Sequence, residues 1–299
     1  MKLRISMMLS APYSGATLFA LILGRDPHIC CNGETFSERL DQLCSCGKKQ
    51  VDCQYFSTVA GHMKLKSRED WDRRLFRHAP LFTKNGFINR ILSGYSVNPV
   101  IGTLQKSICA HPVFRKREQA FVDAHEQFIR ASLNFNDASV FVDGSKIPRR
   151  AEVFADDGRF NLSVLHLVRD GRGFCNSFKK NTGQQDLAIA ARRWMLELKK
   201  VRQFRSKYPN VPVLTVRYED LCHRLVQALN EVRQFLGIPE GEAPDFGNDE
   251  EHHVIGNRMR HEFDGIIKED LSWKDSIGRD SLARIERIMS KGLLKYGYL

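Results

Sequence analysis

Long hydrophobic runs are missing from this sequence. No stretch of the 299 residues reaches the roughly 18 continuous apolar residues of a membrane-spanning helix, which excludes a membrane span. A secretory signal is not expected either, because Pro12, Ser14 and Gly15 interrupt the short apolar run that follows Lys2 and Arg4. We therefore expect a cytoplasmic protein.

Acidic residues are too few to balance the basic ones. Asp and Glu number 35 against 46 Lys and Arg, which gives a formal net charge of +11. A basic protein suits anionic ligands, but the charge alone does not identify the anion. The basic residues are spread along the chain, and aromatic residues are not interleaved with them as a stacking surface for nucleic acid would require. We expect no nucleic-acid partner.

The cysteines lack the setting of a disulfide-rich secreted protein. Several of the eight lie inside apolar stretches, where a thiol packs as a small hydrophobic group, and this favours a reducing compartment. Cys44, Cys46 and Cys53 would need His62 as a fourth ligand to bind zinc. We interpret them instead as packed thiols of an irregular loop, interpret residues 249–253 as a solvated face, and expect no metal.

Short apolar segments alternate with helical patterns along the chain. This alternation predicts a three-layer α/β sandwich with a central parallel sheet, in one domain over residues 1–299. Residues 61–112 are irregular and are predicted to form a helical insert. Strands are predicted at residues 3–9, 28–31, 140–143, 161–168 and 211–216, and helices at residues 18–24, 115–135, 184–207, 222–236 and 280–294.

The turn after the first predicted strand lacks the lysine of a nucleoside-triphosphatase loop. Gly15 and Thr17 match the pattern GxxxxGK[ST], whereas Ser10 replaces the first glycine and Ala16 replaces the lysine. Main-chain N–H groups and a helix N-terminus still suit a phosphate there. The turn therefore predicts binding of a 5′-phosphate without triphosphate chemistry, and an ordinary tight turn is the alternative.

An arginine and a serine follow the clearest buried strand. Arg169 comes directly after Val168, at the strand end where ligands bind in open α/β sheets, and Ser177 follows eight residues later. A guanidinium can hold a phosphate through two charge-assisted hydrogen bonds, and Ser177 could reach the same group. The alternative is that Asp170 forms a strand-end ion pair with one of the arginines.

These segments together resemble the sulfotransferases that use 3′-phosphoadenosine 5′-phosphosulfate (PAPS), in their bacterial-type, P-loop-like form. Residues 12–17 resemble the 5′-phosphosulfate loop of that family, and residues 167–172 with Ser177 resemble its 3′-phosphate motif. The similarity covers most of the chain outside residues 61–112. Further similar segments occur, in the expected order, at residues 44–53, 143–149, 216–221, 235–237, 256–260 and 296–298.

The resemblance implies transfer of a sulfuryl group from PAPS to a hydroxyl or amine, with position and charge supplied by the protein and no metal required. The acceptor would be a small molecule or carbohydrate, bound mainly by residues 61–112. The resemblance assigns cofactor binding to Tyr13, Ser14, Gly15, Ala16, Thr17, Arg169, Ser177, Tyr218, Asn257, Arg258 and Arg260.

One position departs from the family pattern. Tyr13 stands where these enzymes usually carry Arg or Lys, a cation that neutralises charge on the leaving phosphate, and Lys146 could replace it. Glu34 is the candidate base, with His62 and His111 as alternatives. Tyr13 also motivates a non-catalytic binder of PAPS or its product PAP. A nucleotide kinase is a further alternative, which the missing lysine argues against.

Overall fold

The structure is a computed structural model that describes residues 2–34, 43–64, 85–93, 95–246 and 253–299. None of the helices in these residues combines the length and the apolar character that crossing a bilayer requires.

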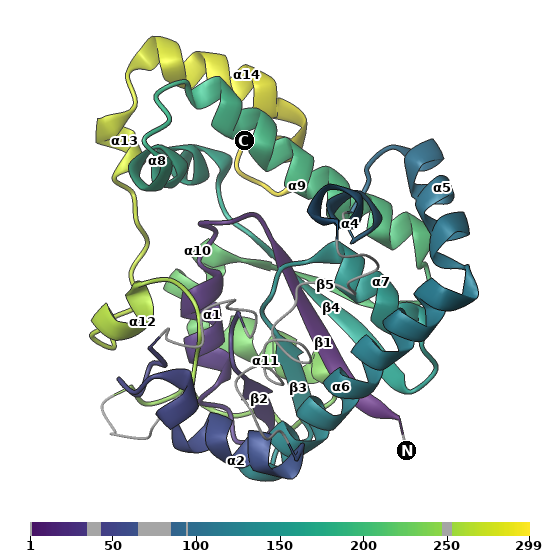
Figure 1. Cartoon of the computed structure of the whole chain (residues 1–299). Coiled ribbons are helices and arrows are strands. Elements are labelled where there is room, and N and C mark those ends of the chain that lie inside the picture. The colour runs from purple at the N-terminus through teal and green to yellow at the C-terminus, as the bar shows by residue number, and fades with distance from the viewer. Residues whose placement is uncertain (1, 35–42, 65–84, 94, 247–252) are drawn as a thin grey trace.

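A five-stranded, all-parallel sheet forms the centre of the molecule (Figure 1), in the order β2-β3-β1-β4-β5. Helices cover both of its faces, which confirms the predicted three-layer α/β sandwich. The strands are β1 (Leu3–Ser10), β2 (Ile29–Cys31), β3 (Val140–Asp143), β4 (Phe160–Val168) and β5 (Val213–Arg217).

β1 is the central strand and lies between β3 and β4, with Ile5 opposite both Phe141 and Leu162. Strands of a parallel sheet are covered on both faces, so nearly all of β1 is buried. Ile5 belongs to the hydrophobic core on one face, and Met8 belongs to the core on the other. The alternation seen in the sequence therefore separates two buried faces.

Each face of the sheet has its own helices. One core is closed by α2 (Gln54–His62), α6 (Pro112–Asn136), α7 (Pro148–Asp156) and α9 (Leu187–Lys207). The opposite core is closed by α1 (Ala16–Leu23), α10 (Tyr218–His223) and α11 (Leu225–Leu236).

A third core forms where three helices pack on the first half of α9, around the buried Trp194. Figure 1 shows α8, α9 and α14 side by side along the top of the molecule. The helices are α8 (Gly171–Thr182), α13 (Trp273–Ser276) and α14 (Arg279–Lys295). The remaining elements are η1 (Gln50–Asp52), α4 (Gly86–Ser93), α5 (Pro99–Cys109) and α12 (Met259–Glu262).

Helix boundaries follow local chemistry. α6 begins at Pro112, since a proline costs no hydrogen bond in the first turn of a helix, and the His111 side chain accepts the Val113 N–H. The helix predicted at residues 222–236 is divided into α10 and α11, because Arg224 has a φ of −142° and interrupts the helical hydrogen bonding.

The described part of the predicted insert packs near the sheet's amino edge. The Tyr95 hydroxyl donates to the carbonyl of Lys200 (3.2 Å), and the Gln203 side chain donates to the carbonyl of Val97 (2.7 Å). The carboxyl end of α9 leads into the start of β5, away from the predicted phosphate loop at residues 12–17. The predicted acceptor-side role stays a prediction, and residues 65–84 and 94 of the insert lie outside the described residues.

Candidate functional site

A glycine and a distant tyrosine shape the turn between β1 and α1. Gly15 has a left-handed backbone (φ 86°), and a Cβ atom added to it would lie 2.5 Å from Cδ2 of Tyr218. Only glycine fits there without strain and collision. Tyr13 also has a positive φ (62°), which is uncommon for a residue with a side chain. The predicted phosphate loop is therefore a defined turn that depends on contact with Tyr218.

Three buried serine hydroxyls lie at the carboxyl edge of the sheet without a hydrogen-bond partner among the described residues. They belong to Ser10 and Ser14, at and after the end of β1, and to Ser145, after the end of β3. Leaving a buried polar group unpaired costs about 1–3 kcal/mol, so such groups are normally satisfied. An anion with several acceptor oxygens would satisfy them.

Arg169 connects the two predicted phosphate motifs. Its Nη1 donates to Oγ of Ser177 (3.2 Å) and to the carbonyl of Tyr13 (3.1 Å). Its guanidinium carbon lies 4.7 Å from the ring centroid of Tyr218, and the residue is buried. Four residues predicted to bind the cofactor thus meet at one guanidinium.

The neighbouring Arg172 has a different role. The Asp170 carboxylate accepts from Nη2 of Arg172 (2.7 Å) and from its N–H (2.8 Å), which also caps the start of α8. The strand-end ion pair considered from the sequence is therefore present, and it engages Arg172. Arg169 remains directed at the phosphate loop.

Asp270 is a member of this site that the sequence analysis missed. Its Oδ2 accepts from Nη2 of Arg169 (3.2 Å), and its Oδ1 accepts from the N–H of Ser272 (3.0 Å). Burial would raise the pKa of Asp270, but the hydrogen bonds from Ser272 and the charge of Arg169 lower it overall. An ionised carboxylate therefore contacts Arg169 where an incoming anion would bind.

The two predicted catalytic residues form an ion pair with each other. Lys146 donates to Oε1 of Glu34, and both follow strand ends, of β3 and β2 respectively. Their meeting depends on close backbone contact, because the Gly144 N–H donates to the carbonyl of Gly33 (3.0 Å) and a Cβ on Gly144 would come within 2.8 Å of Gly33. The carboxylate that would act as a base is engaged by Lys146.

Residues 256–260, which resemble a basic loop of the family, contact the phosphate loop through their main chain and are called the basic loop here. The Asn257 N–H donates to Oγ1 of Thr17 (3.4 Å). Arg260 donates to the carbonyl of Leu43 (2.7 Å), whereas the largely exposed Arg258 pairs with Glu262 (2.5 Å). In the described parts of the chain, the contacts of Arg258 and Arg260 do not extend to Arg169 or Ser177. Their phosphate-binding role stays a prediction.

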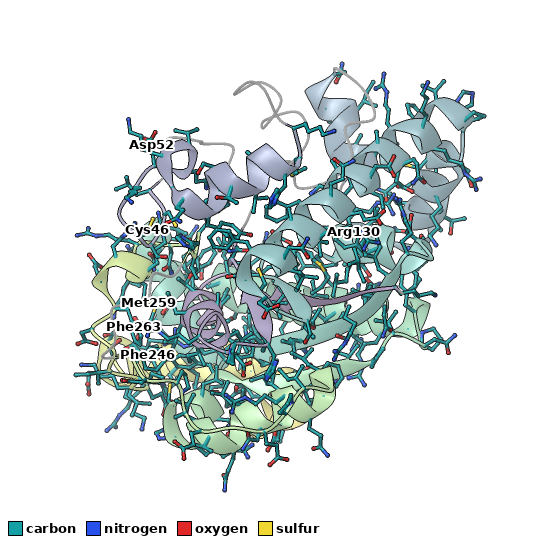
Figure 2. The ribbon with its side chains drawn as sticks, turned by 90° about the horizontal axis from the view of Figure 1, so that it is seen from below. Cys46, Asp52, Arg130, Phe246, Met259 and Phe263 are labelled. Atoms are coloured by element: carbon teal, nitrogen blue, oxygen red, sulfur yellow. The ribbon has the colours of Figure 1, made fainter. Side chains whose placement is uncertain are left out.

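Hydrophobic residues on either side of this loop in the sequence pack beside α1. Figure 2 shows Phe246, Met259 and Phe263 together on one side of the molecule. The rings of Phe246 and Phe263 pack edge to face with centroids 5.1 Å apart, and both side chains lie against the core under α1. The basic loop thus runs between the phosphate loop and a packed aromatic pair.

Solved structures contain the same arrangement of sheet and helices. The sulfotransferase domain of the Synechococcus PCC 7002 olefin synthase matches with a TM-score of 0.52 and 16% identity, over 97% of this chain and 96% of its own. The chain has the sulfotransferase fold. The sulfotransferase domain of the curacin biosynthetic pathway also gives a TM-score of 0.52, at 17% identity, over 97% of each chain. No family model matches the sequence, and no curated protein matches it.

Two other segments of the resemblance, residues 216–221 and 296–298, meet at the strand end next to Arg169. Glu219 accepts from the N–H of Asp170 (2.9 Å) and from the hydroxyl of Tyr298 (2.7 Å). Burial raises the pKa of Glu219, opposed in part by these hydrogen bonds. The Trp194 indole donates to the carbonyl of Arg169 (3.2 Å) from the hydrophobic core, so it holds the backbone at the strand end.

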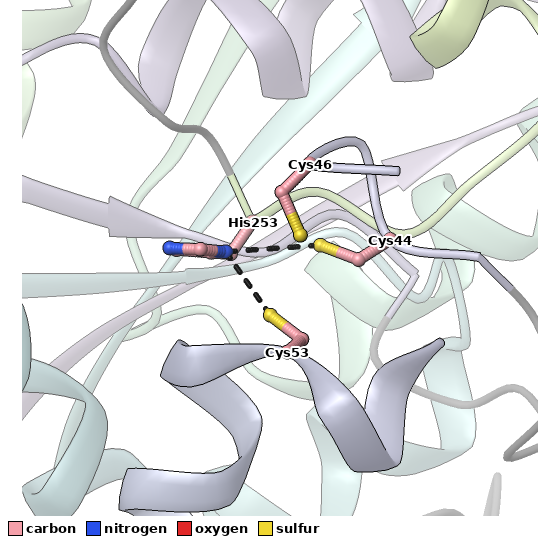
Figure 3. Close-up of side chains that lie close together, drawn as sticks. All are labelled: Cys44, Cys46, Cys53 and His253. Carbon is pink, nitrogen blue, oxygen red and sulfur yellow. Dashed lines mark hydrogen bonds between the residues drawn. The ribbon is translucent and has the colours of Figure 1, made fainter. Parts of the chain in front are cut away.

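Three cysteines and a histidine form a second cluster in this sulfotransferase fold (Figure 3). The ligand atoms of Cys44, Cys46, Cys53 and His253 all lie within 4.8 Å of one another. His62, the fourth ligand considered from the sequence, is exposed at the end of α2. The interpretation of His253 as part of a solvated face was wrong, because its ring is half-buried against the thiols. Residues 249–252 lie outside the described residues.

Proposed function

We propose that the protein is a sulfotransferase that uses PAPS. Arg169 carries the proposal, because its guanidinium contacts Ser177 of the predicted 3′-phosphate motif and the main chain of the predicted 5′-phosphosulfate loop. PAPS carries anionic groups on both sides of one ribose. A protein that binds it needs two anion-binding elements in contact with each other.

The chain's own groups fit the donor. Ser14, the main chain of residues 15–17 and the N-terminus of α1 would hold the 5′-phosphosulfate. Arg169 and Ser177 would hold the 3′-phosphate after the Asp270 carboxylate leaves the guanidinium. PAPS, once bound, supplies the activated sulfuryl group.

Transfer would use the pair formed by Glu34 and Lys146. The acceptor hydroxyl or amine forms the new bond to sulfur while the bond from sulfur to the 5′-phosphate oxygen breaks, and PAP leaves with the electron pair of that bond. Glu34 accepts the acceptor's proton, and the Lys146 ammonium balances the charge on the phosphate. Both roles require Glu34 and Lys146 to separate.

Calorimetric titration with two nucleotides tests the donor site. Arg169→Ala should weaken binding of PAP at least tenfold, because a charge-assisted bond contributes about 1.5–3 kcal/mol. Binding of 5′-AMP, which lacks the 3′-phosphate, should change much less. Arg193→Ala, which removes an exposed guanidinium on α9, is the matched control and should leave both affinities unchanged. Equal losses for the two nucleotides in Arg169→Ala would argue against a 3′-phosphate site.

Release of PAP from PAPS in the presence of phenol, carbohydrate and amine acceptors tests the transfer itself. A non-catalytic binder of PAP is the second candidate, since the Tyr13 ring packs edge to face on Phe178 (6.0 Å) and brings no cation to the loop. That candidate predicts tight PAP binding without release of PAP from PAPS. Tyr13→Arg would then add the missing charge and raise transfer.

A further inference from the structure

Three thiols and an imidazole from distant parts of the chain meet beside α2 (Figure 3). Cys44 and Cys46 lie before η1, Cys53 immediately precedes α2, and His253 comes from the segment that leads to the basic loop. Nδ1 of His253 lies 3.1 Å from Sγ of Cys53 and 3.8 Å from Sγ of Cys44. We propose that these four residues bind a structural zinc ion.

The geometry fits tetrahedral zinc. Zn–S bonds of about 2.3 Å and Zn–N bonds of about 2.0 Å place neighbouring ligand atoms roughly 3.5–3.8 Å apart in a tetrahedron. The distances from Nδ1 of His253 to Sγ of Cys44 (3.8 Å) and of Cys53 (3.1 Å) lie on either side of the roughly 3.5 Å expected between nitrogen and sulfur, and all four ligand atoms lie within 4.8 Å of one another. Four protein ligands complete the coordination of the metal and leave no position for water, which is typical of structural rather than catalytic zinc.

The surroundings hold Cys44 and His253 in place. The Cys44 N–H donates to the carbonyl of Lys48 (2.8 Å), and the Gly47 N–H donates to the carbonyl of Cys44 (2.9 Å), in a turn where Gly47 has a φ of 79°. The His253 ring stacks on Tyr55, with centroids 5.3 Å apart and planes 14° apart. Such support around the ligands fixes the ring orientation that a metal needs.

The charge of the site is also balanced. Three thiolates and one Zn²⁺ carry a net charge of minus one, and the guanidinium of Arg260 donates to the carbonyl of Leu43, next to Cys44. A disulfide between Cys44 and Cys53 would use two of the sulfurs. It would not explain why the His253 imidazole faces both of them. All eight cysteines of the chain are thiols in this structure.

Zinc would join the segment after β2 to the loop that contacts the phosphate loop. Just beyond His253, the Ile255 N–H donates to the carbonyl of Asn32 (2.9 Å), and the Glu34 N–H donates to the carbonyl of Ile255 (2.7 Å). The metal therefore stabilises the backbone that positions Glu34 and Asn257, and this consequence for the active site rests on the proposed function. The zinc site itself does not depend on the proposed function.

Elemental analysis of the full chain, purified under reducing conditions without chelator, tests the proposal. We expect one zinc per chain. His253→Ala and Cys53→Ser should each reduce the zinc content at least fivefold. His62→Ala and Cys109→Ser, which change a histidine and a cysteine outside the cluster, should retain one zinc per chain.

A second measurement covers the case in which a ligand variant does not fold. Wild-type protein stripped by a chelator should take up Co²⁺ and show the visible bands of tetrahedral cobalt and the charge-transfer band of thiolate ligands. Its melting temperature should fall on stripping and recover with Zn²⁺ but not with Mg²⁺.

Reduced protein that holds no zinc and takes up no cobalt, or a disulfide between Cys44 and Cys53 in freshly purified protein, would overturn the proposal. Neither measurement involves PAP or sulfuryl transfer, so its failure is distinguishable from failure of the proposed function.

Discussion

Lys146 donates a hydrogen bond to the carboxylate of Glu34 where the neighbouring strands β3 and β2 end. The two residues were predicted separately, one as a source of positive charge and the other as a base. Their pairing makes them one unit, in which either residue would act only after the other releases it. Acceptor binding is the event that would separate them, because the acceptor's hydroxyl or amine competes for the same carboxylate oxygen.

Glu34→Gln should therefore lower kcat for sulfuryl transfer by about 10²–10⁴, the usual contribution of general acid–base catalysis, with little change in the Kd for PAP. Lys146→Met should also lower kcat, since it removes the charge that balances the leaving phosphate. Lys200→Met is a matched control, because Lys200 is similarly buried and pairs with Glu197 at 2.9 Å on α9. Initial rates of PAP release at saturating PAPS are the measurement. A fully active Glu34→Gln enzyme would remove Glu34 from the mechanism.

Asp270→Asn should strengthen the binding of PAP by about fivefold. The Asp270 carboxylate contacts the guanidinium that we assign to the 3′-phosphate. Removing this competing charge is worth about 1 kcal/mol, because the Asp270 side chain is nearly half exposed. Binding of 5′-AMP should be unchanged. Calorimetric titrations of both nucleotides provide the comparison. If Asp270→Asn weakened PAP binding instead, Asp270 would be a residue that orients Arg169 rather than one that competes with the ligand.

Alanine substitutions at two glycines distinguish the stability lost to backbone strain from the stability lost to a steric clash of the added Cβ atom. Gly15→Ala combines a φ of 86° with a Cβ atom 2.5 Å from the Tyr218 ring. Gly183→Ala has a similar φ of 73° but no atom within 4 Å of the added Cβ. We expect Gly183→Ala to cost about 1 kcal/mol of unfolding free energy and Gly15→Ala to cost at least twice as much. Urea denaturation measures both. Equal costs would mean that the Tyr218 ring moves aside without penalty.

Contacts that depend on nearby residues or on strand ends could be predicted from the sequence. Arg169 and Ser177 are eight residues apart, and α8 turns that spacing into a contact of 3.2 Å. The turn at Gly15 could be placed because it joins a clear strand to a clear helix. The parallel sheet then brought the ends of β1 and β4 to one edge, as the alternation of strands and helices implied.

Among the helices that escaped prediction, α7 and α8 carry charge or glycine on their buried faces. α7 buries Arg149, Arg150 and Glu152, and Arg150 pairs with Asp143 at 2.7 Å, so no hydrophobic period marks the helix. Burial lowers the pKa of Arg150 to about 10, although the charge of Asp143 opposes the shift. α8 begins with Gly171-Arg172-Gly173, a sequence that favours a loop, and it depends on the Asp170 cap.

Asp270, which contacts Arg169, and His253, which contacts the thiols, escaped prediction for a different reason. Asp270 and His253 lie in segments without hydrophobic periodicity, about 100 residues from Arg169 and about 200 from Cys53. Only the path of the chain around α1 brings them to their partners. A single sequence contains no signal for such a path.

Acid should destabilise the protein through His166. This residue is buried in β4, and burial, with smaller contributions from the charges of Lys295 and Arg205, lowers its pKa to about 3 from an ordinary value of 6.5. Its imidazole is therefore neutral in the folded protein when the unfolded chain already binds a proton. The folded state is unaffected by this residue above pH 6.5, and it loses about 1.4 kcal/mol per pH unit as the pH falls from 6.5 toward 3.

The slope of stability against pH measures this effect. Urea denaturation of the wild type between pH 7 and pH 4.5 should show a steady loss, and His166→Gln should reduce the slope, because no proton then binds at this position in either state. His62→Gln, which changes an exposed histidine on α2, should keep the wild-type slope. A slope that is the same in His166→Gln and in the wild type would mean that His166 binds its proton in the folded protein as readily as in the unfolded chain, against the burial of its ring in β4.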